Sequence, residues 1–260
     1  MINLSQGHLN LLETCPPQFQ KIYLEQLNSP INPEIQARLT WGSRFHLLMQ
    51  QRELGLPIES WLQEDDELVQ AIASLLDAAP NILQPHPESF RDAEHCRTLK
   101  ERGHLLTVIY DLLITNSSQA QIIDWKTYFQ PRNKAKLATN WQTRLYLYIL
   151  GETSSYVPEQ ISMTYWFVKL PHKPQSLTFT YNSKQHEQTR QDLSQLLTKL
   201  DGWLQDYLNE GIALPHRPNC QDTCPYYQSW LAFPGEGNQE AMKGEDYLSA
   251  SIEDIEEVSI

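Results

Sequence analysis

Apolar residues recur at helical spacing in the first third of the chain. They lie three or four positions apart over residues 33–54. Residues 65–78 begin with acidic side chains, which helix N-termini favour, and then continue with the same period. A further helix is predicted over residues 6–27, interrupted at Cys15-Pro16-Pro17 because proline ends or begins helices. The pattern therefore predicts a mainly helical part over residues 1–87.

Beyond residue 87 the pattern is typical of strands that alternate with helices. Strands are predicted over residues 97–100, 104–115, 120–127, 161–169 and 175–181, and helices over residues 137–150 and 185–208. The segment Asn116-Ser117-Ser118-Gln119 is typical of a hairpin turn between two of these strands. We therefore expect an α/β fold, with a central mixed β-sheet flanked by helices in residues 88–234 and a helical N-terminal half before it.

The composition argues against a disordered or membrane-spanning chain. The 260 residues are 40% hydrophobic and 20% charged. No uncharged apolar run approaches the roughly 18 residues that cross a bilayer, and the N-terminal sequence lacks the basic and apolar regions of a signal peptide. We expect a cytoplasmic protein with no membrane partner, in which residues 1–234 form one domain.

The charged residues are unevenly distributed. The formal net charge is −12, and residues 235–260 contain eight acidic residues and one lysine, which predicts a flexible acidic tail. By contrast, residues 126–150 contain five basic residues and no acidic one. Four of these are candidates for phosphate contact, although a solvated loop would have the same composition: Arg132, Lys134, Lys136 and Arg144.

Two aspartates and a lysine lie on the two strands of the predicted hairpin. Because side chains alternate between the faces of a strand, Asp124 and Lys126 point to one side and Trp125 to the other, and the neighbouring strand can bring Asp111 beside them. Carboxylates suit Mg²⁺ or Mn²⁺, and a nearby lysine can orient a water molecule. An exposed edge pair is the alternative, but the strongly apolar strand around both residues favours a catalytic metal site.

Further residues make up a recognisable order along the chain: Gly42-x-x-x-His46, Glu94, Asp111, Asp124-Trp125-Lys126-Thr127 and Gln142-x-x-x-Tyr146. This order resembles the RecB-type branch of the PD-(D/E)XK nuclease superfamily. The sequence LNLLETCPPQFQKIY over residues 9–23 also resembles the "CP-x-x-F-x-x-Y" opening of that branch. The resemblance covers about residues 4–230.

The resemblance implies a site for Mg²⁺ or Mn²⁺. The implied ligands are His46, Asp111, Asp124 and the backbone carbonyl of Trp125. Glu94 is a candidate for a further ligand, although Glu88 competes for that role. Each supporting ligand also has an ordinary explanation, since His46 can be a packing detail and Glu94 a surface acid.

The resemblance also implies roles for three residues beside the metal. Lys126 would position the attacking water and stabilise charge on the scissile phosphate. Gln142 and Tyr146, one helical turn apart, would contact the substrate backbone or brace the site. Packing in the core is the alternative role for Tyr146, which lies in the apolar segment LYLYIL.

The cysteines only partly match the family pattern. Many RecB-type nucleases hold a [4Fe–4S] cluster with one N-terminal and three C-terminal cysteines. Cys15 resembles the first, and Cys220 and Cys224 the next two, but Trp230 stands where the last is expected. Because such clusters need four thiolates, we expect no [4Fe–4S] cluster and a vestigial grouping of the three cysteines. His216 could assist a zinc site, although its spacing alone defines none.

The resemblance implies a metal-dependent nuclease that hydrolyses DNA phosphodiester bonds in repair, recombination or defence, with a helicase or other repair protein as a candidate partner. One alternative is a catalytically altered or inactive module of the same fold that binds nucleic acid or a partner. Another is a structural protein whose carboxylates bind metal only for stability. The acidic tail would either keep the chain soluble or compete with nucleic acid for the basic residues after Lys126.

Overall fold

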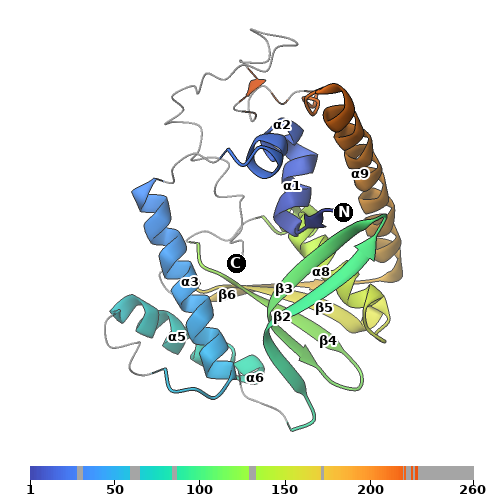
Figure 1. Ribbon diagram of the computed structural model, residues 1–260. Coiled ribbons are helices and arrows are strands. Elements are labelled where there is room, and N and C mark those ends of the chain that lie inside the picture. Colours follow the sequence, from blue (N-terminus) through green and yellow to red (C-terminus); the bar gives the residue numbers. More distant parts are fainter. Residues whose placement is uncertain are drawn as a thin grey trace. The chain divides into compact units, whose positions relative to one another are not determined.

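A computed structural model describes most of the chain in two compact units (Figure 1). The first unit comprises Met1–Pro30, Arg102–His104 and Arg190–Ile260, and the second comprises Ile31–Glu101 and Leu105–Thr189. The structure describes residues 1–27, 32–58, 65–83, 87–128, 133–170, 173–218, 220, 224, 226 and 227. Arg132, Trp230 and the predicted tail over residues 235–260 lie outside the described residues.

A mixed sheet forms the centre of the second unit. Its strands are β2 (Phe90–Glu101), β3 (His104–Thr115), β4 (Ala120–Lys126), β5 (Ile161–Phe167) and β6 (Gln175–Thr180). β2 pairs with β3, β3 with β4 antiparallel, β4 with β5 parallel, and β5 with β6 antiparallel. The predicted α/β fold with a mixed central sheet is thus confirmed.

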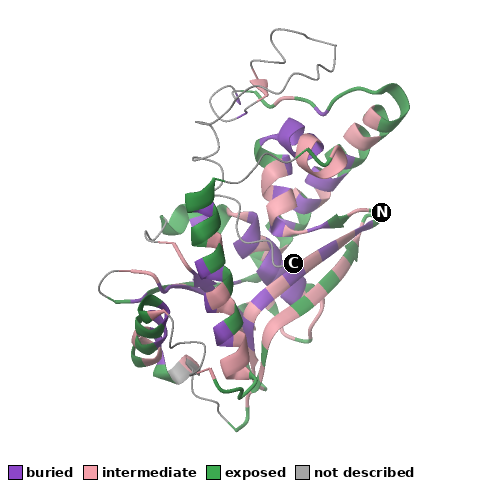
Figure 2. Ribbon diagram, turned by 60° about the vertical axis from the view of Figure 1, so that its left-hand side comes forward, coloured by how far each residue is buried: buried purple, intermediate pink, exposed green. Residues whose placement is uncertain are grey.

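Helices cover both faces of this sheet. They are α3 (Pro33–Glu53), α5 (Asp66–Ala78), α6 (Pro80–Leu83), α7 (Lys134–Thr139) and α8 (Trp141–Glu152), while the short 3₁₀ helix η2 (Pro158–Gln160) directly precedes β5. The buried side chains of α3 and α5 form one core cluster with Leu112, Ile123, Trp125 and Trp166 of the sheet. On α3 these buried residues alternate with exposed ones, as expected of a helix with one face on the core (Figure 2).

The alternation of side chains along β4 decides which residues reach which layer. Trp125 belongs to the core cluster shared with α3 and α5. Asp124 and Lys126 point to the opposite face, where both contact Gln142 of α8. The register of β4 with β5 places Tyr165 beside Asp124, on the same face of the sheet. The sheet thus separates the core cluster that contains Trp125 from the buried polar group of Asp124, Lys126 and Gln142.

The first unit contains β1 (Asn3–Leu4), α1 (Gln6–Thr14), α2 (Pro16–Phe19), the π-helical turn η1 (Gln20–Leu24) and the part of α9 (Ser183–Glu210) that follows Thr189. Its segments are joined by polar contacts. The Gln20 side chain accepts a hydrogen bond from the backbone N–H of Leu214 at 2.7 Å, and His104 pairs with Asp201 at 2.8 Å. None of the helices described here is long and apolar enough to cross a membrane.

Two elements differ from the sequence-based expectation. The helix predicted over residues 137–150 is divided into α7 and α8 at Asn140, whose backbone is extended and whose side chain accepts a hydrogen bond from the N–H of Gln142 at 2.7 Å. Asparagine competes with helical hydrogen bonding and favours such N-cap positions. Strand β2 begins at Phe90, seven positions earlier than predicted, because its polar first half pairs along the sheet edge without an apolar run.

Candidate functional site

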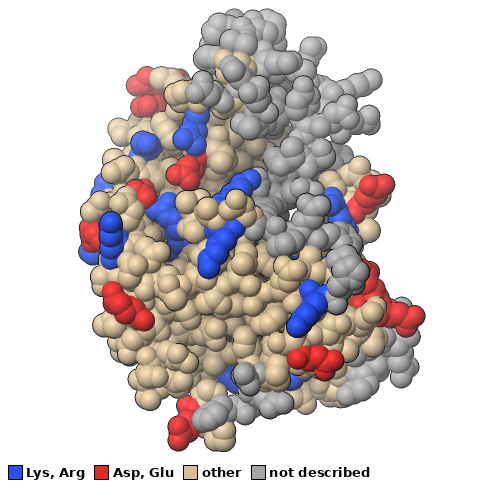
Figure 3. Space-filling model, turned by 180° about the vertical axis from the view of Figure 1, so that it is seen from behind, with Lys and Arg blue, Asp and Glu red and all other residues tan. Residues whose placement is uncertain are grey.

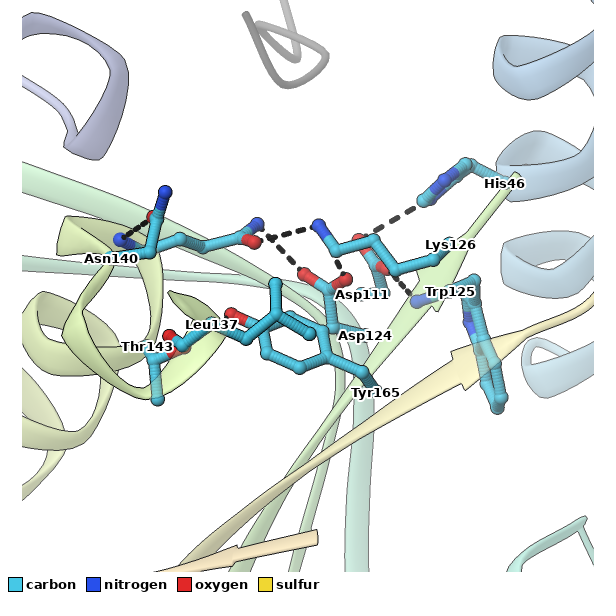
Figure 4. A network of polar contacts seen from close by, with 10 residues as sticks. His46, Asp111, Asp124, Trp125, Lys126, Leu137, Asn140, Thr143 and Tyr165 are labelled. Atoms are coloured by element: carbon cyan, nitrogen blue, oxygen red, sulfur yellow. Dashed lines mark hydrogen bonds and ion pairs between the residues drawn. The ribbon is translucent and has the colours of Figure 1, made fainter. Parts of the chain in front are cut away.

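Asp124, Lys126 and Gln142 form a closed polar network on the α8 side of the sheet. The Lys126 ammonium lies 2.9 Å from Oδ1 of Asp124 and donates to Oε1 of Gln142 at 2.6 Å. The amide Nε2 of Gln142 donates in turn to Oδ2 of Asp124 at 2.9 Å (Figure 4). The three residues are only 3%, 6% and 4% exposed. Both buried charges are therefore compensated by each other and by one amide, as burial requires.

The start of α8 holds this network against the sheet. Asn140 caps the helix through the N–H of Gln142, and the hydroxyl of Thr143 lies 2.7 Å from that of Tyr165 on β5. The ring of Tyr165 is also 4.9 Å from the Lys126 ammonium, within range of a cation–π interaction. No motif in the sequence points to Asn140, Thr143 or Tyr165. The only sequence signal was an asparagine directly before an apolar helical pattern.

A second polar cluster joins His46 of α3, Glu94 of β2 and Asp111 of β3. One ligand atom from each residue lies within 4.8 Å of the others. Oδ1 of Asp111 is 3.3 Å from Nδ1 of His46, while its Oδ2 accepts a hydrogen bond from the N–H of Trp125 at 2.5 Å (Figure 4). Two carboxylates and one imidazole fit a divalent cation such as Mn²⁺ or Mg²⁺.

The metal-donor cluster and the lysine network meet at β4. Asp111 is bonded to the backbone of Trp125, and the neighbours of Trp125 on either side are Asp124 and Lys126. Asp124 does not belong to the three-residue cluster, because its two oxygens face Lys126 and Gln142. The sharing of one cation by Asp111 and Asp124, with the Trp125 carbonyl, therefore stays a prediction.

Glu94 reaches the cluster through an unusual backbone conformation. Its φ is +53°, in the left-handed region that non-glycine residues rarely adopt, within the otherwise extended β2. Such residues re-aim a side chain and often mark functional sites. Glu88, its competitor in the sequence analysis, is exposed in the turn before β2. The two glutamates differ in backbone conformation and in their contacts, and no residue pattern encodes either difference.

We expect the variant Glu94→Gly to have a free energy of unfolding about 1 kcal/mol higher than Glu94→Ala. The left-handed conformation costs alanine about 1–2 kcal/mol, part of which the extra backbone entropy of glycine offsets. Both variants lose the carboxylate, so both should bind Mn²⁺ more weakly than the wild type. Urea unfolding in EDTA and calorimetric Mn²⁺ titration measure the two effects.

Glu88→Ala is the matched control and should leave Mn²⁺ binding unchanged. Equal stability of the glycine and alanine variants would show that position 94 is not strained. A loss of Mn²⁺ binding in Glu88→Ala alone would assign the ligand role to Glu88 instead.

Tyr146 is a buried residue of α8. Its ring meets that of Tyr110 edge-on, with 5.2 Å between centroids, and the Tyr110 hydroxyl donates to the backbone carbonyl of Tyr146 at 3.0 Å. Burial raises the pKa of Tyr110, so this hydroxyl stays a donor. The ring of His95, next to Glu94, is stacked 6.1 Å from that of Tyr110. Contact of Tyr146 with substrate stays a prediction, whereas the structure shows its packing against Tyr110.

The described candidates for phosphate contact lie on α7 and α8. Lys134 and Lys136 are exposed, and Arg144 is partly buried. The Lys134 ammonium is 5.5 Å from the ring centroid of Phe179, and the Arg144 guanidinium is 4.4 Å from that of Trp141. On the face drawn in Figure 3, the described Lys and Arg side chains are interspersed with Asp and Glu. A continuous basic surface is not present in that view, so the role of these residues stays a prediction.

The first unit brings three cysteines together with a histidine. Cys15, Cys220 and Cys224 are buried in one small cluster, and Nδ1 of His216 lies 3.4 Å from Sγ of Cys220 and 3.5 Å from Sγ of Cys224. A hydrogen bond with Cys224 lowers the pKa of the Cys15 thiol and raises that of Cys224. Burial lowers the pKa of His216, which favours its neutral form.

Comparisons with known proteins agree with this architecture. A sequence model of the PD-(D/E)XK nuclease superfamily matches residues 3–229. No curated protein sequence matches the chain. The crystal structure of a "Putative exonuclease" from Eubacterium rectale is 8% identical, with a TM-score of 0.53 over 95% of this chain and 93% of that chain. The crystal structure of SSO0001 is 12% identical over 75% of this chain and 76% of that one, but its TM-score of 0.33 is too low to support an argument.

The structural likeness concerns the fold alone, because the identities are low. The sequence match is the stronger finding, since it extends over nearly the whole chain and includes both polar clusters of the second unit. The chain therefore belongs to the PD-(D/E)XK nuclease superfamily.

Proposed function

We propose that the chain is a divalent-metal-dependent nuclease of the RecB-type branch that hydrolyses phosphodiester bonds of DNA. The observation that carries the proposal is that the metal-donor cluster and the lysine network meet at β4. There the carboxylate of Asp111, in a cluster of metal donors, is bonded to the backbone directly between Asp124 and Lys126. A cationic side chain held beside a carboxylate-rich metal site suits the hydrolysis of an anionic ester.

His46, Glu94 and Asp111 would hold the cation, with Asp124 as a further ligand. Nucleases of this superfamily generally use divalent metals. The cation, when bound, would polarise the phosphodiester and lower the pKa of a water molecule. Which of Mg²⁺ and Mn²⁺ serves is left to the experiment, because oxygen and imidazole donors suit both.

Lys126 would orient the attacking water and stabilise negative charge on the phosphate. The network gives this side chain a fixed position, because the carboxylate of Asp124 and the amide of Gln142 both bind its ammonium. Pre-positioned charge of this kind needs little reorganisation during reaction. Gln142 is then a positioning residue, and Lys134, Lys136 and Arg144 are candidates for contact with the phosphate backbone.

A catalytically altered binding module of the same fold is the second candidate. It is favoured by the engagement of both Asp124 oxygens with Lys126 and Gln142, which a bound cation would have to replace. A role in repair, recombination or defence and a helicase partner are further parts of the proposal that the resemblance alone supports. The cytoplasmic location is a further part that rests on the sequence features described above.

The test is cleavage of labelled single-stranded DNA, duplex DNA and RNA of one sequence, with Mg²⁺, Mn²⁺ or EDTA. We expect cleavage of DNA that needs the metal and is lost in Lys126→Ala. Lys100→Ala, which removes an exposed lysine of β2, should be as active as the wild type. Circular and linear duplexes distinguish internal cutting from cutting at ends.

Metal-independent cleavage, or equal activity in Lys126→Ala, would contradict the proposed mechanism. Binding of DNA with no cleavage under any of these conditions would favour the second candidate. Cleavage restricted to RNA would retain the nuclease and change its substrate.

A further inference from the structure

The cysteine cluster of the first unit offers four metal ligands. Cys15 lies between α1 and α2, and its N–H and C=O are both bonded within these helices, to Leu11 and Gln18. Cys220 and Cys224 lie beyond α9, where the N–H of Cys224 donates to the carbonyl of Cys220 at 2.7 Å. The three thiols are buried together, with His216 beside them. Backbone contacts on both sides thus give the ligands defined positions.

The distances among three of these ligands fit a single metal ion. One ligand atom each from His216, Cys220 and Cys224 lies within 4.8 Å of the others. The His216 nitrogen is 3.4 and 3.5 Å from the two sulfurs. Zinc with tetrahedral bonds of about 2.3 Å to sulfur and about 2.0–2.1 Å to nitrogen places two such ligands about 3.6 Å apart. The Cys15 thiol is not one of these three ligands, but it is hydrogen-bonded to Cys224 in the same buried cluster and is the candidate for the fourth position.

The same residues do not fit a [4Fe–4S] cluster. Such a cluster is held by four thiolates, each on a different iron, so its ligands stand farther apart than those of one ion. The chain has four cysteines in all, and the fourth, Cys96, is exposed on β2 of the second unit. A Cys₃His set is instead a common ligand set of structural zinc sites.

We propose that Cys15, His216, Cys220 and Cys224 bind one structural Zn²⁺, in place of an iron–sulfur cluster. The ion joins the N-terminal helices α1 and α2 to the segment that follows α9, two parts of the first unit about 200 residues apart in the sequence. Cross-links that close long loops restrict the unfolded chain most. The aromatic side chains Tyr226 and Tyr227 pack against the cluster and shield it from water. The proposal does not depend on the nuclease function of the second unit.

The test is metal and sulfide analysis of the full chain, purified anaerobically from cells supplied with both iron and zinc. We expect one zinc per chain and neither iron nor acid-labile sulfide. Four irons with sulfide would overturn the proposal, and so would one iron per chain or no bound metal. A thiol reagent should release one zinc per chain from the wild type, measured with a colorimetric chelator. This measurement does not depend on whether any variant folds.

Substitutions of single cysteine and histidine residues test which side chains bind the zinc. His216→Ala should bind zinc at least about a hundredfold more weakly, since loss of a direct ligand costs more than the 10–100-fold loss for outer-shell partners. His216→Cys supplies another zinc ligand and should retain the ion. Cys96→Ser, the matched control, should keep one zinc per chain.

Zinc removal should also lower the unfolding temperature on the order of 10 °C in the wild type and in Cys96→Ser. Full zinc content in His216→Ala would overturn the assignment of this ligand. An unchanged unfolding temperature after zinc removal would overturn the structural role.

Discussion

Replacing Asp111 by asparagine is expected to lower metal-dependent DNA cleavage by about a thousandfold or more. Asp111 faces His46 with one oxygen and holds the backbone of Trp125 with the other, so it connects the metal donors to β4. Asparagine retains the shape of the side chain but removes its negative charge. A thousandfold loss corresponds to roughly 4 kcal/mol of transition-state stabilisation, within the range that a metal ion supplies.

Single-turnover rates and calorimetric Mn²⁺ affinity are the measurements for Asp111→Asn. Both should decrease, because the variant weakens the binding of the ion itself. Asp77→Asn, which neutralises an exposed carboxylate of α5, controls for net charge and should match the wild type in both. Retention of cleavage within tenfold in Asp111→Asn would remove this residue from the catalytic site.

Removing either charge of the buried pair Asp124–Lys126 is expected to destabilise the fold by about 3–5 kcal/mol, because the remaining charge stays buried without its partner. The side chains of Lys126 and Asp124 are only 8% and 4% exposed. The variants Asp124→Asn and Lys126→Met each leave one such charge. The double variant leaves none, so it should be more stable than the sum of the single changes predicts, by about 2 kcal/mol or more.

Urea unfolding in EDTA measures this coupling without interference from bound cations. The partly exposed ion pair Lys21–Glu25, at 2.7 Å, is the matched control. Its coupling should be about 0.5 kcal/mol or less, as is usual for such helical pairs. A coupling equally small for Asp124 and Lys126 would show that their charges are not confined in the core.

Cleavage activity and stability should respond differently to these substitutions. Both single variants and the double variant lack a charged group of the site, so all three should be inactive even where the double variant is stable. This separation distinguishes a catalytic role of the pair from a purely structural one. Activity in the double variant would contradict the proposed function of Lys126.

The sequence by itself determined the elements that carry the site. Strand alternation alone placed Trp125 on one face of β4 and Asp124 with Lys126 on the other, because a two-residue period leaves no other arrangement. The apolar run and the turn before Ala120 predicted β3 and β4 as a hairpin, and the structure confirms their antiparallel pairing. The order of motifs along the chain was also enough to indicate the nuclease superfamily to which the chain belongs.

Only the tertiary structure decided which side chains share a contact. The left-handed backbone at Glu94 brings that glutamate, and not Glu88, to His46 and Asp111. His216 contacts Cys220 and Cys224, and these pack with Cys15 because the segment after α9 lies against α1 and α2 within the first unit. Both outcomes depend on contacts between residues distant in sequence, and local patterns carry no information about them. Periodicity determines the face on which a side chain lies, whereas packing determines what it meets there.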